Sequence, residues 1–348
     1  MSIKKITIPE FIVLANEYPV FDVRSNGEYG HAHIPNANNL PLFSDEERKI
    51  VGTAYKKIGK QEAIKLGLDF FGVKMKSMVE EVEKIISTQQ SKSNIILVHC
   101  WRGGMRSAGV AWLLDLYGFE VYTLIGGYKA FRNWVLQQFE KDYNIKVLGG
   151  YTGSAKTELL KSLSVNNENI IDLEGLACHK GSAFGGIGQP QQPSQEMFEN
   201  KLAVALHKLS TSPFWIEDES QRIGVLNIPP SFWKTIRKSS IYFIDVPFEE
   251  RLDFIIKGYG QFEKEKLVGA IMRIQKRFGP LETKTAISFL LEDNIREAFV
   301  LLLTYYDKSY IKALHNRENI TALLQKISFT KIDIALNTKN LLSFFNPN

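Results

Sequence analysis

The sequence predicts an α/β protein with two parallel-sheet domains, the second of which ends in a helical region. The chain has 348 residues, more than one hydrophobic core usually supports, so two domains are expected. Short apolar runs alternate with helical patterns, as in parallel sheets that helices cover on both faces. Two polar loops that contain glycine each separate an apolar run from a helical pattern, which is the strand-to-helix connection of such sheets.

The first domain is expected to span residues 1–143. Its predicted strands are residues 20–23, a short segment ending at Leu40, residues 95–98 and residues 121–124. The stretch 44–86 is charged and amphipathic, so we expect a helical insertion there. A helical pattern follows Ser107, and another covers residues 130–142. Together these elements predict one parallel sheet with helices around it.

The second domain is expected to span residues 144–348. Its predicted strands are residues 145–148, 170–173, 214–218 and 241–245, each of them an apolar run. Helical periodicity dominates from Glu249 toward the C-terminus. We therefore expect a nucleotide-binding type of α/β core with a helical C-terminal extension.

The composition is that of an ordinary globular protein, with 44% hydrophobic and 23% charged residues. Two cysteines in so long a chain argue against a disulfide framework and favour a reducing compartment. The N-terminal residues lack a secretory apolar stretch, and no apolar run reaches membrane-spanning length. We therefore expect a cytoplasmic protein without a membrane partner. The net charge of +5 is compatible with a polyanionic partner.

A cysteine-containing loop at residues 99–107 is the strongest indication of chemistry. Its sequence is His-Cys-Trp-Arg-Gly-Gly-Met-Arg-Ser, between an apolar run and a helical pattern. Backbone amides and the positive end of a helix converge on Cys100, which lowers the pKa of a thiol and favours the thiolate. Arg102 and Arg106 add positive charge suited to an anionic sulfur, selenium or phosphorus donor. We expect these three residues to be catalytic; the alternative is a small buried cysteine with a packing role.

A phosphate-binding loop (P-loop) is predicted at residues 150–157. The sequence Gly-Tyr-Thr-Gly-Ser-Ala-Lys-Thr matches G-x-x-x-x-G-K-T except that Ala155 replaces the last glycine. In such loops amides surround the phosphates, the lysine meets the terminal phosphate, and the hydroxyl binds Mg²⁺. The residues expected to bind phosphate or diphosphate are Gly150, Gly153, Ser154, Lys156 and Thr157. The methyl group of Ala155 lies where backbone normally approaches phosphate most closely, and the alternative is a glycine-rich turn without a ligand.

Acidic residues end the third predicted strand of the second domain. In P-loop proteins this strand end carries the acid that organises Mg²⁺ and water, so Asp218 and Glu217 are the candidates. Mg²⁺ is the one cofactor considered, and no tightly bound cofactor is expected. The polar, glycine-rich segment 172–186 follows another strand end, the usual place for a substrate loop. It contains Cys178 and His179, which lack further ligands at metal-binding spacing.

Further charged residues are expected to support these sites. Asp22 and Arg24 follow a neighbouring strand, where an ion-pair network would hold the cysteine loop. Basic residues crowd the stretch 257–277. A solvated helix face and a nucleic-acid contact are equally compatible with that stretch. The candidates for contact are Arg273, Lys276 and Arg277.

Motifs along the chain resemble known proteins. Asp-Val-Arg at 22–24, Glu-Tyr at 28–29, His-Ile-Pro-Asn-Ala-Asn at 33–38 and the Cys100 loop resemble a rhodanese domain over about the first 140 residues. In order with further motifs, they resemble the bacterial tRNA 2-selenouridine synthase family over most of the chain. The further motifs are Gly-Gly-Tyr-Lys at 126–129, the P-loop, His-Lys-Gly-Ser-Ala-Phe-Gly at 179–185, Gln-Pro-Ser-Gln at 192–195 and Glu-Asp-Glu-Ser at 217–220.

This resemblance implies chemistry at the wobble uridine, position 34 of the tRNA. The 2-thiouridine sulfur would attack C1 of geranyl diphosphate, giving an S-geranyl intermediate and diphosphate. Selenium from selenophosphate would then displace the geranylated sulfur, giving 2-selenouridine. Cys100 would carry a persulfide-like selenium adduct, and Lys156 and Thr157 with Mg²⁺ would neutralise the leaving diphosphate. The resemblance also implies tRNA contact by the basic stretch, an enzyme that supplies selenophosphate as a partner, and Gly67 in a prenyl pocket.

Two other enzyme functions fit the same motifs. One is a rhodanese-type sulfurtransferase that passes persulfide sulfur between proteins, with the P-loop regulating it. The other is a P-loop kinase that uses Lys156 and Asp218, with the rhodanese domain as a sensor. A non-enzymatic tRNA-binding module is disfavoured because the thiol loop is intact. Nucleotide turnover without tRNA would indicate the kinase, whereas selenium incorporation into thiolated tRNA would exclude it.

Overall fold

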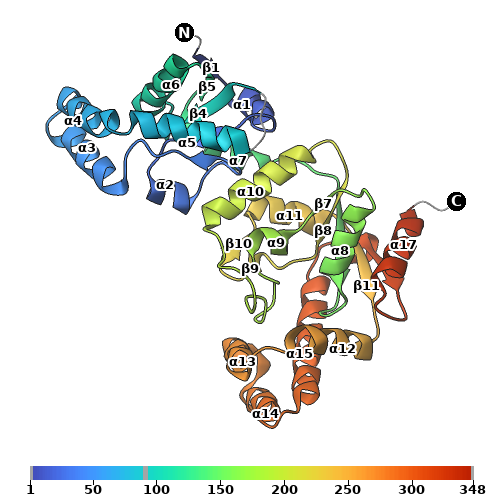
Figure 1. Cartoon of the computed structure of the whole chain (residues 1–348). Helices are drawn as coiled ribbons and strands as arrows, with labels where there is room; N and C mark the ends of the chain where they lie inside the picture. The colour runs from blue at the N-terminus through green and yellow to red at the C-terminus, as the bar shows by residue number, and fades with distance from the viewer. Residues whose placement is uncertain (1–2, 89–92, 346–348) are drawn as a thin grey trace. The chain divides into compact units, whose positions relative to one another are not determined.

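The computed structural model describes residues 3–88 and 93–345 (Figure 1). The chain forms two compact units. The N-terminal unit comprises residues 1–138 together with 199–204, and the C-terminal unit comprises residues 139–198 and 205–348. Within the described residues no helix is long and apolar enough to cross a membrane.

The N-terminal unit is built around a five-stranded parallel sheet with strand order β1-β5-β4-β2-β3. The strands are β1 (Lys4–Ile6), β2 (Val20–Asp22), β3 (Asn38–Asn39), β4 (Ile95–His99) and β5 (Glu120–Leu124). The helices are α1 (Ile8–Leu14), α2 (Asn26–His31), α3 (Asp45–Lys57), α4 (Lys60–Gly72), α5 (Met75–Thr88), α6 (Met105–Tyr117) and α7 (Gly127–Gln138). The predicted parallel sheet is confirmed. The edge strand β1 was not expected, because its three residues are too few to form an apolar pattern.

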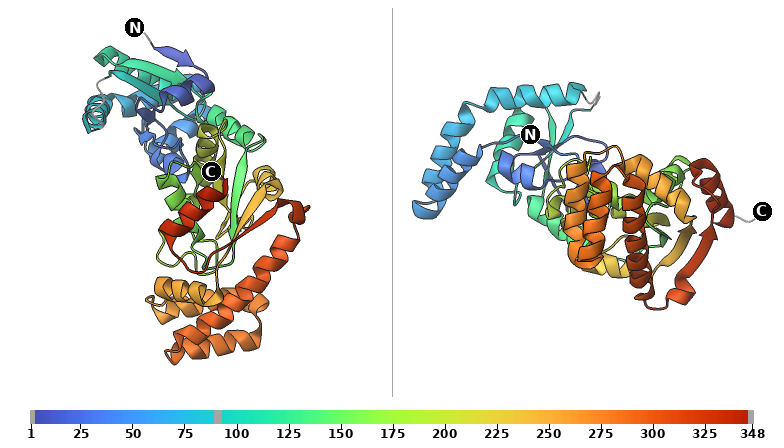
Figure 2. Two further views of the ribbon diagram at one scale, coloured as in Figure 1. Left: turned by 90° about the vertical axis from the view of Figure 1, so that its right-hand side faces the viewer. Right: turned by 90° about the horizontal axis from the view of Figure 1, so that it is seen from below.

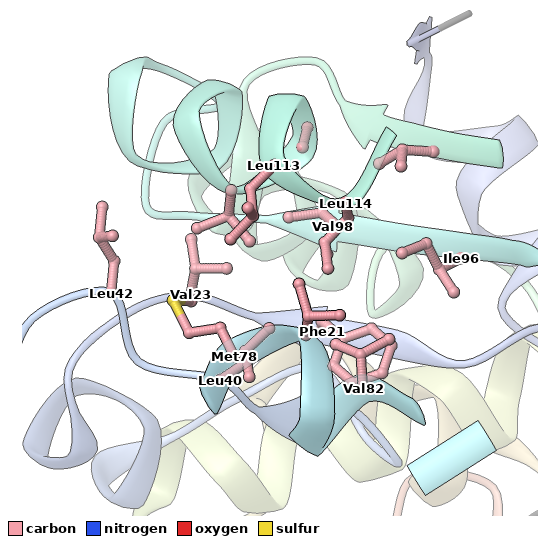
Figure 3. Close-up of a cluster of buried hydrophobic side chains, with 14 of the residues drawn as sticks. Phe21, Val23, Leu40, Leu42, Met78, Val82, Ile96, Val98, Leu113 and Leu114 are labelled. Atoms are coloured by element: carbon pink, nitrogen blue, oxygen red, sulfur yellow. The ribbon is translucent and has the colours of Figure 1, made fainter. Parts of the chain in front are cut away.

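The central strand β4 is buried on both faces of the sheet. Ile96 and Val98 share one face, since alternate residues of a strand point in opposite directions. On that face they pack with Val82 of α5 and Leu114 of α6, and Figure 3 shows these side chains gathered into one cluster. Leu97, on the opposite face, is equally buried. The strand that leads to Cys100 is thus held firmly from both sides.

The predicted helical insertion at 44–86 consists of the three helices α3 to α5. Ser44 begins α3 with a capping box, in which its hydroxyl accepts the Glu47 amide and the Glu47 carboxylate accepts the Ser44 amide. Gly59 separates α3 from α4 with a φ of 134°, a conformation that other residues rarely adopt. Helix α5 is not peripheral, because its Val82 belongs to the core of the sheet.

The C-terminal unit is built around a second five-stranded parallel sheet, with strand order β12-β11-β6-β8-β7. The strands are β6 (Ile145–Gly150), β7 (Ile170–Ile171), β8 (Phe214–Glu217), β11 (Ser240–Asp245) and β12 (Leu324–Ser328), with β9 (Arg222–Ile223) and β10 (Leu226–Asn227) as a separate antiparallel pair. The first helices are α8 (Lys156–Val165), α9 (Leu173–Ala177), α10 (Gln195–Lys208) and α11 (Pro230–Lys238). The later ones are α12 (Phe248–Tyr259), α13 (Lys264–Phe278), α14 (Pro280–Leu291), α15 (Ile295–His315), α16 (Ile320–Leu323) and α17 (Ile334–Phe345).

The helical C-terminal extension is confirmed, and it runs as far as α17. One strand within it was not expected, because β12 pairs with β11 at the edge of the sheet. The β12 sequence Leu-Gln-Lys-Ile-Ser is only partly buried and lacks the apolar run of a buried strand. The hydrophobic pattern therefore did not predict a strand there. The helix predicted over 130–142 ends at Gln138, before the segment that leads into β6.

Helices α12 to α15 form a helical lobe with its own apolar core, drawn in orange in Figure 2. A buried arginine ties this lobe to the P-loop. Arg251 forms an ion pair with Asp307 of α15 at 2.7 Å and donates to the Thr152 carbonyl at 3.0 Å. The helical extension predicted from the sequence therefore packs directly against the loop that is expected to bind phosphate.

Candidate functional site

Cys100 directly follows β4, and backbone hydrogen bonds hold its loop in place. The Tyr128 amide donates to the Cys100 carbonyl at 2.8 Å, and the Lys129 amide donates to the Trp101 carbonyl at 3.0 Å. This approach requires glycine at position 127, because a Cβ on Gly127 would lie 2.3 Å from the Cys100 carbonyl oxygen. The Gly-Gly-Tyr-Lys motif therefore positions the cysteine loop.

Hydrogen bonds in the loop favour the thiolate form of Cys100. Burial by itself would raise the pKa of this thiol, because a charge is poorly solvated inside a protein. The Ser107 hydroxyl lies 3.2 Å from Sγ, and the Gly104 amide donates to Sγ at 3.4 Å. With the backbone amides of Ser107 and Arg102, these donors hold the pKa below its ordinary value. The arrangement can supply a nucleophilic sulfur.

The two arginine side chains of the loop have different surroundings. Arg106 forms an ion pair with Glu28 of α2 at 2.8 Å, and Arg48 binds the same carboxylate. Two guanidinium groups therefore share the Glu28 carboxylate, and an incoming anion has to compete with that carboxylate for Arg106. The Arg102 side chain is exposed and offers its charge to anions that arrive from solvent.

A buried ion pair is joined to the cysteine loop through Tyr128. Asp22 and Arg24 are both buried, and their side chains meet at 2.5 Å. The Arg24 guanidinium lies 3.8 Å from the centre of the Tyr128 ring, within the range of a cation–π contact. Because the Tyr128 amide binds the carbonyl of Cys100, the ion pair and the thiol loop form one connected unit.

The predicted P-loop connects β6 to α8. Nζ of Lys156 donates to the carbonyl oxygens of Gly150 and Tyr151 at 3.0 and 3.2 Å. The ammonium group thus connects the end of the loop to its beginning. The Ser154 hydroxyl donates to the Tyr151 carbonyl at 2.7 Å. Gly153 faces the helical lobe, where a Cβ would lie 2.7 Å from a side chain of α12. The loop is therefore packed on one side and faces a cavity on the other.

Ala155 has a left-handed backbone conformation, with φ of 56° and ψ of 36°. This conformation costs a residue with a Cβ about 1–2 kcal/mol, whereas glycine adopts it readily. Alanine in place of the usual glycine therefore strains the backbone of the P-loop, and it also places a methyl group in the loop.

Three glutamates lie beside the P-loop: Glu174 of α9, Glu217 at the end of β8, and Glu219. One carboxylate oxygen of each lies within 4.8 Å of the others, and the Thr157 hydroxyl donates to Glu174 at 3.1 Å. Burial raises the pKa of Glu217 to about 8, with the charge of Glu174 as the second cause. Oε1 of Glu217 is buried and has no hydrogen-bond partner in the described part of the chain. Crowded carboxylates with a free buried oxygen fit a hard divalent cation.

Asp218 does not belong to this acidic cluster, contrary to expectation. Its carboxylate forms an ion pair with Arg317 and accepts a hydrogen bond from the Tyr310 hydroxyl at 2.8 Å. Successive residues at a strand end face opposite ways, so its side chain lies on the other side from Glu217. Tyr310 also accepts the Gly150 amide at 3.1 Å, which links Asp218 to the P-loop. Asp218 is therefore an anchor for the loop.

Sequence reasoning missed several of these groups. Glu174 lies in the polar segment 172–186 that the sequence singled out, yet its carboxylate was not assigned a role. Tyr310 and Arg317 carried no local signal, because they come from the helical C-terminal part and meet Asp218 only in the folded chain.

A cavity of about 2140 Å³ extends from the P-loop to the helical lobe. Lys156, Thr157 and the three glutamates are part of its lining. The basic side chains contributed by α12 and α13 are Lys257, Lys266, Arg273 and Arg277. Of the three predicted nucleic-acid contacts, Arg273 and Arg277 line this cavity and Lys276 does not. The basic stretch therefore faces the same space as the P-loop.

Gly67, His179 and Cys178 are the remaining residues that the sequence singled out. Gly67 lies in α4 of the N-terminal unit, buried against Phe43, whereas the cavity lining belongs to the C-terminal unit. His179 lines the cavity, and burial together with the charge of Arg273 lowers its pKa. Cys178 beside it is a partly buried free thiol.

Comparison with known families assigns both units. Residues 10–133 match the rhodanese-like domain, and residues 143–333 match the family described as tRNA 2-selenouridine synthase AAA domain.

Curated relatives match most of the chain. The tRNA 2-selenouridine synthase of Nitrosomonas europaea is 36% identical over 289 residues, which cover 81% of this chain and 73% of the relative. The tRNA 2-selenouridine synthase of Sulfurovum sp. is 34% identical over 335 residues, covering 86% and 89%. This chain belongs to the tRNA 2-selenouridine synthase family. As a tRNA 2-selenouridine synthase it is an enzyme, a transferase with a rhodanese domain and a P-loop domain.

One solved structure is similar to part of this synthase. The N-terminal domain of a putative ATP/GTP binding protein from Clostridium difficile 630 is 41% identical, covering 38% of this chain and 99% of that chain with a TM-score of 0.35.

The backbone of Ala155 leads to a prediction about the synthase's P-loop. Ala155→Gly should bind inorganic diphosphate several-fold more tightly, because it removes a methyl group from the loop and lets the backbone approach the phosphate more closely. Isothermal titration calorimetry measures the affinity. As a control, Ala108→Gly in α6 should only destabilise the protein, by about 1 kcal/mol. Weaker diphosphate binding by Ala155→Gly would contradict the prediction.

Proposed function

We propose that this chain converts wobble 2-thiouridine, at position 34 of tRNA, to 2-selenouridine through an S-geranyl-2-thiouridine intermediate. Geranyl diphosphate and selenophosphate are the proposed co-substrates. The observation that carries the proposal is the cavity in which the P-loop and the basic face of α13 meet, since it offers a small diphosphate and a polyanionic RNA one common space. A tRNA substrate and two free thiols favour the cytoplasm as the site of action.

In the first step the 2-thiouridine sulfur attacks C1 of geranyl diphosphate. A carbon–sulfur bond forms, the carbon–oxygen bond breaks, and diphosphate leaves with the electron pair. Lys156 and the amides of the P-loop stabilise the charge that develops on the leaving group. Mg²⁺ held by Thr157, Glu174, Glu217 and Glu219 would supply further charge neutralisation when bound.

The walls of the cavity support this assignment. Apolar side chains of the helical lobe, among them Phe254, Ile255 and Ile274, line the cavity and offer a surface to a prenyl chain. Arg273 and Arg277 lie on the exposed side of α13, where they can bind phosphates of the RNA backbone.

In the second step the selenium of selenophosphate attacks C2 of the modified uridine. A carbon–selenium bond forms, the carbon–sulfur bond to the uridine breaks, and geranylthiol leaves. Selenium stays at the selenide level, so this exchange needs no oxidant, whereas a sulfur–selenium bond on Cys100 would need one. We therefore assign the Cys100 thiolate to attack on phosphorus, which breaks the selenium–phosphorus bond before water releases phosphate. Only 3% of Cys100 is exposed, which favours a small donor.

An enzyme that makes selenophosphate is the proposed partner. Selenophosphate carries an easily broken selenium–phosphorus bond, so direct supply would limit its loss to water.

The function as a whole is tested by mass spectrometry of wobble nucleosides from cells with and without this chain. The proposal expects 2-selenouridine only when the chain is present. Loss of 2-thiouridine itself on deletion would instead indicate a sulfurtransferase, and nucleotide turnover without tRNA would indicate a kinase.

The role of the thiolate predicts a split between the two steps. Cys100→Ser should abolish selenium incorporation and leave S-geranylation close to wild type, because the thiolate acts only in the second step. Liquid chromatography with mass spectrometry of the product nucleosides measures both. Cys178→Ser removes the other free thiol and should keep both steps. Wild-type 2-selenouridine formation by Cys100→Ser would rule out this assignment.

The P-loop lysine predicts a defect in the first step. Lys156→Ala should slow S-geranylation by about two to three decades, since a preorganised donor to a developing charge contributes roughly 3–4 kcal/mol. Single-turnover kinetics with 2-thiolated tRNA and geranyl diphosphate measure the rate. Lys161→Ala, which removes another lining cation from α8, should have a much smaller effect. An unaltered rate in Lys156→Ala would mean that the P-loop binds a phosphate group other than the diphosphate of geranyl diphosphate.

The basic face of α13 predicts how tRNA binding depends on salt. Arg273→Gln and Arg277→Gln should each lower tRNA affinity and reduce the slope of log K against log salt by about 0.7–0.9. Lys276→Gln, on the same helix but outside the cavity lining, should leave the slope near wild type. Fluorescence anisotropy over a salt series measures it. Equal slopes in all three variants would indicate that this helix face is solvated and does not contact tRNA.

A further inference from the structure

A second group of nitrogen donors lies in the cavity, apart from the P-loop. Trp233 and Arg237 of α11 are part of the lining. The Arg237 guanidinium lies 5.3 Å from the centre of a Trp233 ring, and it donates to the Ala313 carbonyl at 3.3 Å. That hydrogen bond is long, so the side chain can shift toward a ligand with little loss.

Several buried donors of this group are not satisfied. Nε1 of Trp233 and both Nε and Nη1 of Arg317 are buried, and no hydrogen-bond partner for them exists among the residues that the structure describes. Buried donors are nearly always paired, because an unpaired one loses its bonds to water. Trp233 belongs to the cavity lining, so a ligand in the cavity can supply the acceptor that its Nε1 lacks.

The charge of the group is unbalanced. Arg317 is paired with Asp218, whose carboxylate also accepts the Tyr310 hydroxyl. Burial and then the charge of Arg317 lower the pKa of Arg237, with Asp218 acting in the opposite sense. The charges of Arg237 and Arg317 therefore repel each other, and an anion beside Arg237 would relieve this repulsion.

We propose that Trp233 and Arg237 form a phosphate-binding subsite that takes a phosphodiester group of the bound tRNA, with the charge of the buried Arg317 as a further attraction. The donors are planar N–H groups of the kind that bind phosphate oxygens, and the Asp218 carboxylate is already occupied by Arg317 and Tyr310. The choice of tRNA rests on the proposed function.

The position of the subsite supports an RNA phosphate over a small ligand. The cavity of about 2140 Å³ is larger than the roughly 300–1,000 Å³ that a small ligand fills, and the P-loop already offers a site for the diphosphate. A chain of two hydrogen bonds, from the Gly150 amide to Tyr310 and from Tyr310 to Asp218, joins the subsite to the P-loop. An RNA strand in the cavity can therefore reach the subsite while the diphosphate occupies the loop.

The test compares single substitutions on α11 in the full chain. Arg237→Gln should weaken binding of 2-thiolated tRNA about tenfold, as expected for loss of hydrogen bonds to a charged group, and reduce the salt slope by about 0.7–0.9. Trp233→Phe should weaken binding without changing the slope, because it removes a donor and no charge. Arg237→Lys should restore the slope. The control Lys238→Gln removes an exposed charge of the same helix, outside the lining, and should bind like wild type.

Binding of inorganic diphosphate is measured on the same variants and should stay at the wild-type value. Equal tRNA affinities for Arg237→Gln, Trp233→Phe and Lys238→Gln would overturn the subsite while leaving the proposed function intact. Weakened diphosphate binding with unaltered tRNA binding would also overturn it, since the phosphate would then belong to a small substrate. A wild-type chain that does not bind tRNA would overturn both proposals.

Discussion

Parallel pairing of neighbouring strands is the constraint on which both candidate sites depend. In the N-terminal sheet Asp22 is in register with His99, so the strand with the buried ion pair ends beside the strand that leads to Cys100. In the C-terminal sheet Leu148 is in register with Glu217, so the P-loop and the glutamates begin at one edge. Because helical connections return the chain between parallel strands, the carboxyl ends of neighbouring strands lie together at one edge of each sheet.

Buried arginines hold the loops at these sheet edges. The three pairs are Arg24 with Asp22, Arg251 with Asp307, and Arg317 with Asp218. Each is linked to a site loop: the first through Tyr128, the second through the Thr152 carbonyl, and the third through Tyr310. Loss of one partner from a buried pair costs about 3–5 kcal/mol, because the other charge stays unpaired. The pairs thus keep flexible, glycine-containing loops in one conformation.

The two sites use burial in opposite ways. Around Cys100, amides and a hydroxyl outweigh the cost of burying a charge, and the thiol pKa falls. Around Glu217, burial and the nearby Glu174 are only partly offset by Lys156, and the carboxyl pKa rises. Hydrogen-bond donors directed at an atom favour its anion, whereas crowded acceptors disfavour it. One unit is therefore suited to generating an anionic nucleophile, and the other to binding cations and the anions that accompany them.

The sequence by itself determined the two parallel-sheet units, the strands that lead into both loops, and the positions of Cys100 and Lys156. These features are encoded locally, because a strand, a glycine-containing turn and a helix start follow one another within a few residues. Only the tertiary structure separated Asp218 from Glu217 and brought Arg317 to its carboxylate. It also added β12, a partly exposed edge strand without an apolar run. These contacts join residues about a hundred positions apart, and no local pattern records which strand ends the folded sheet brings together.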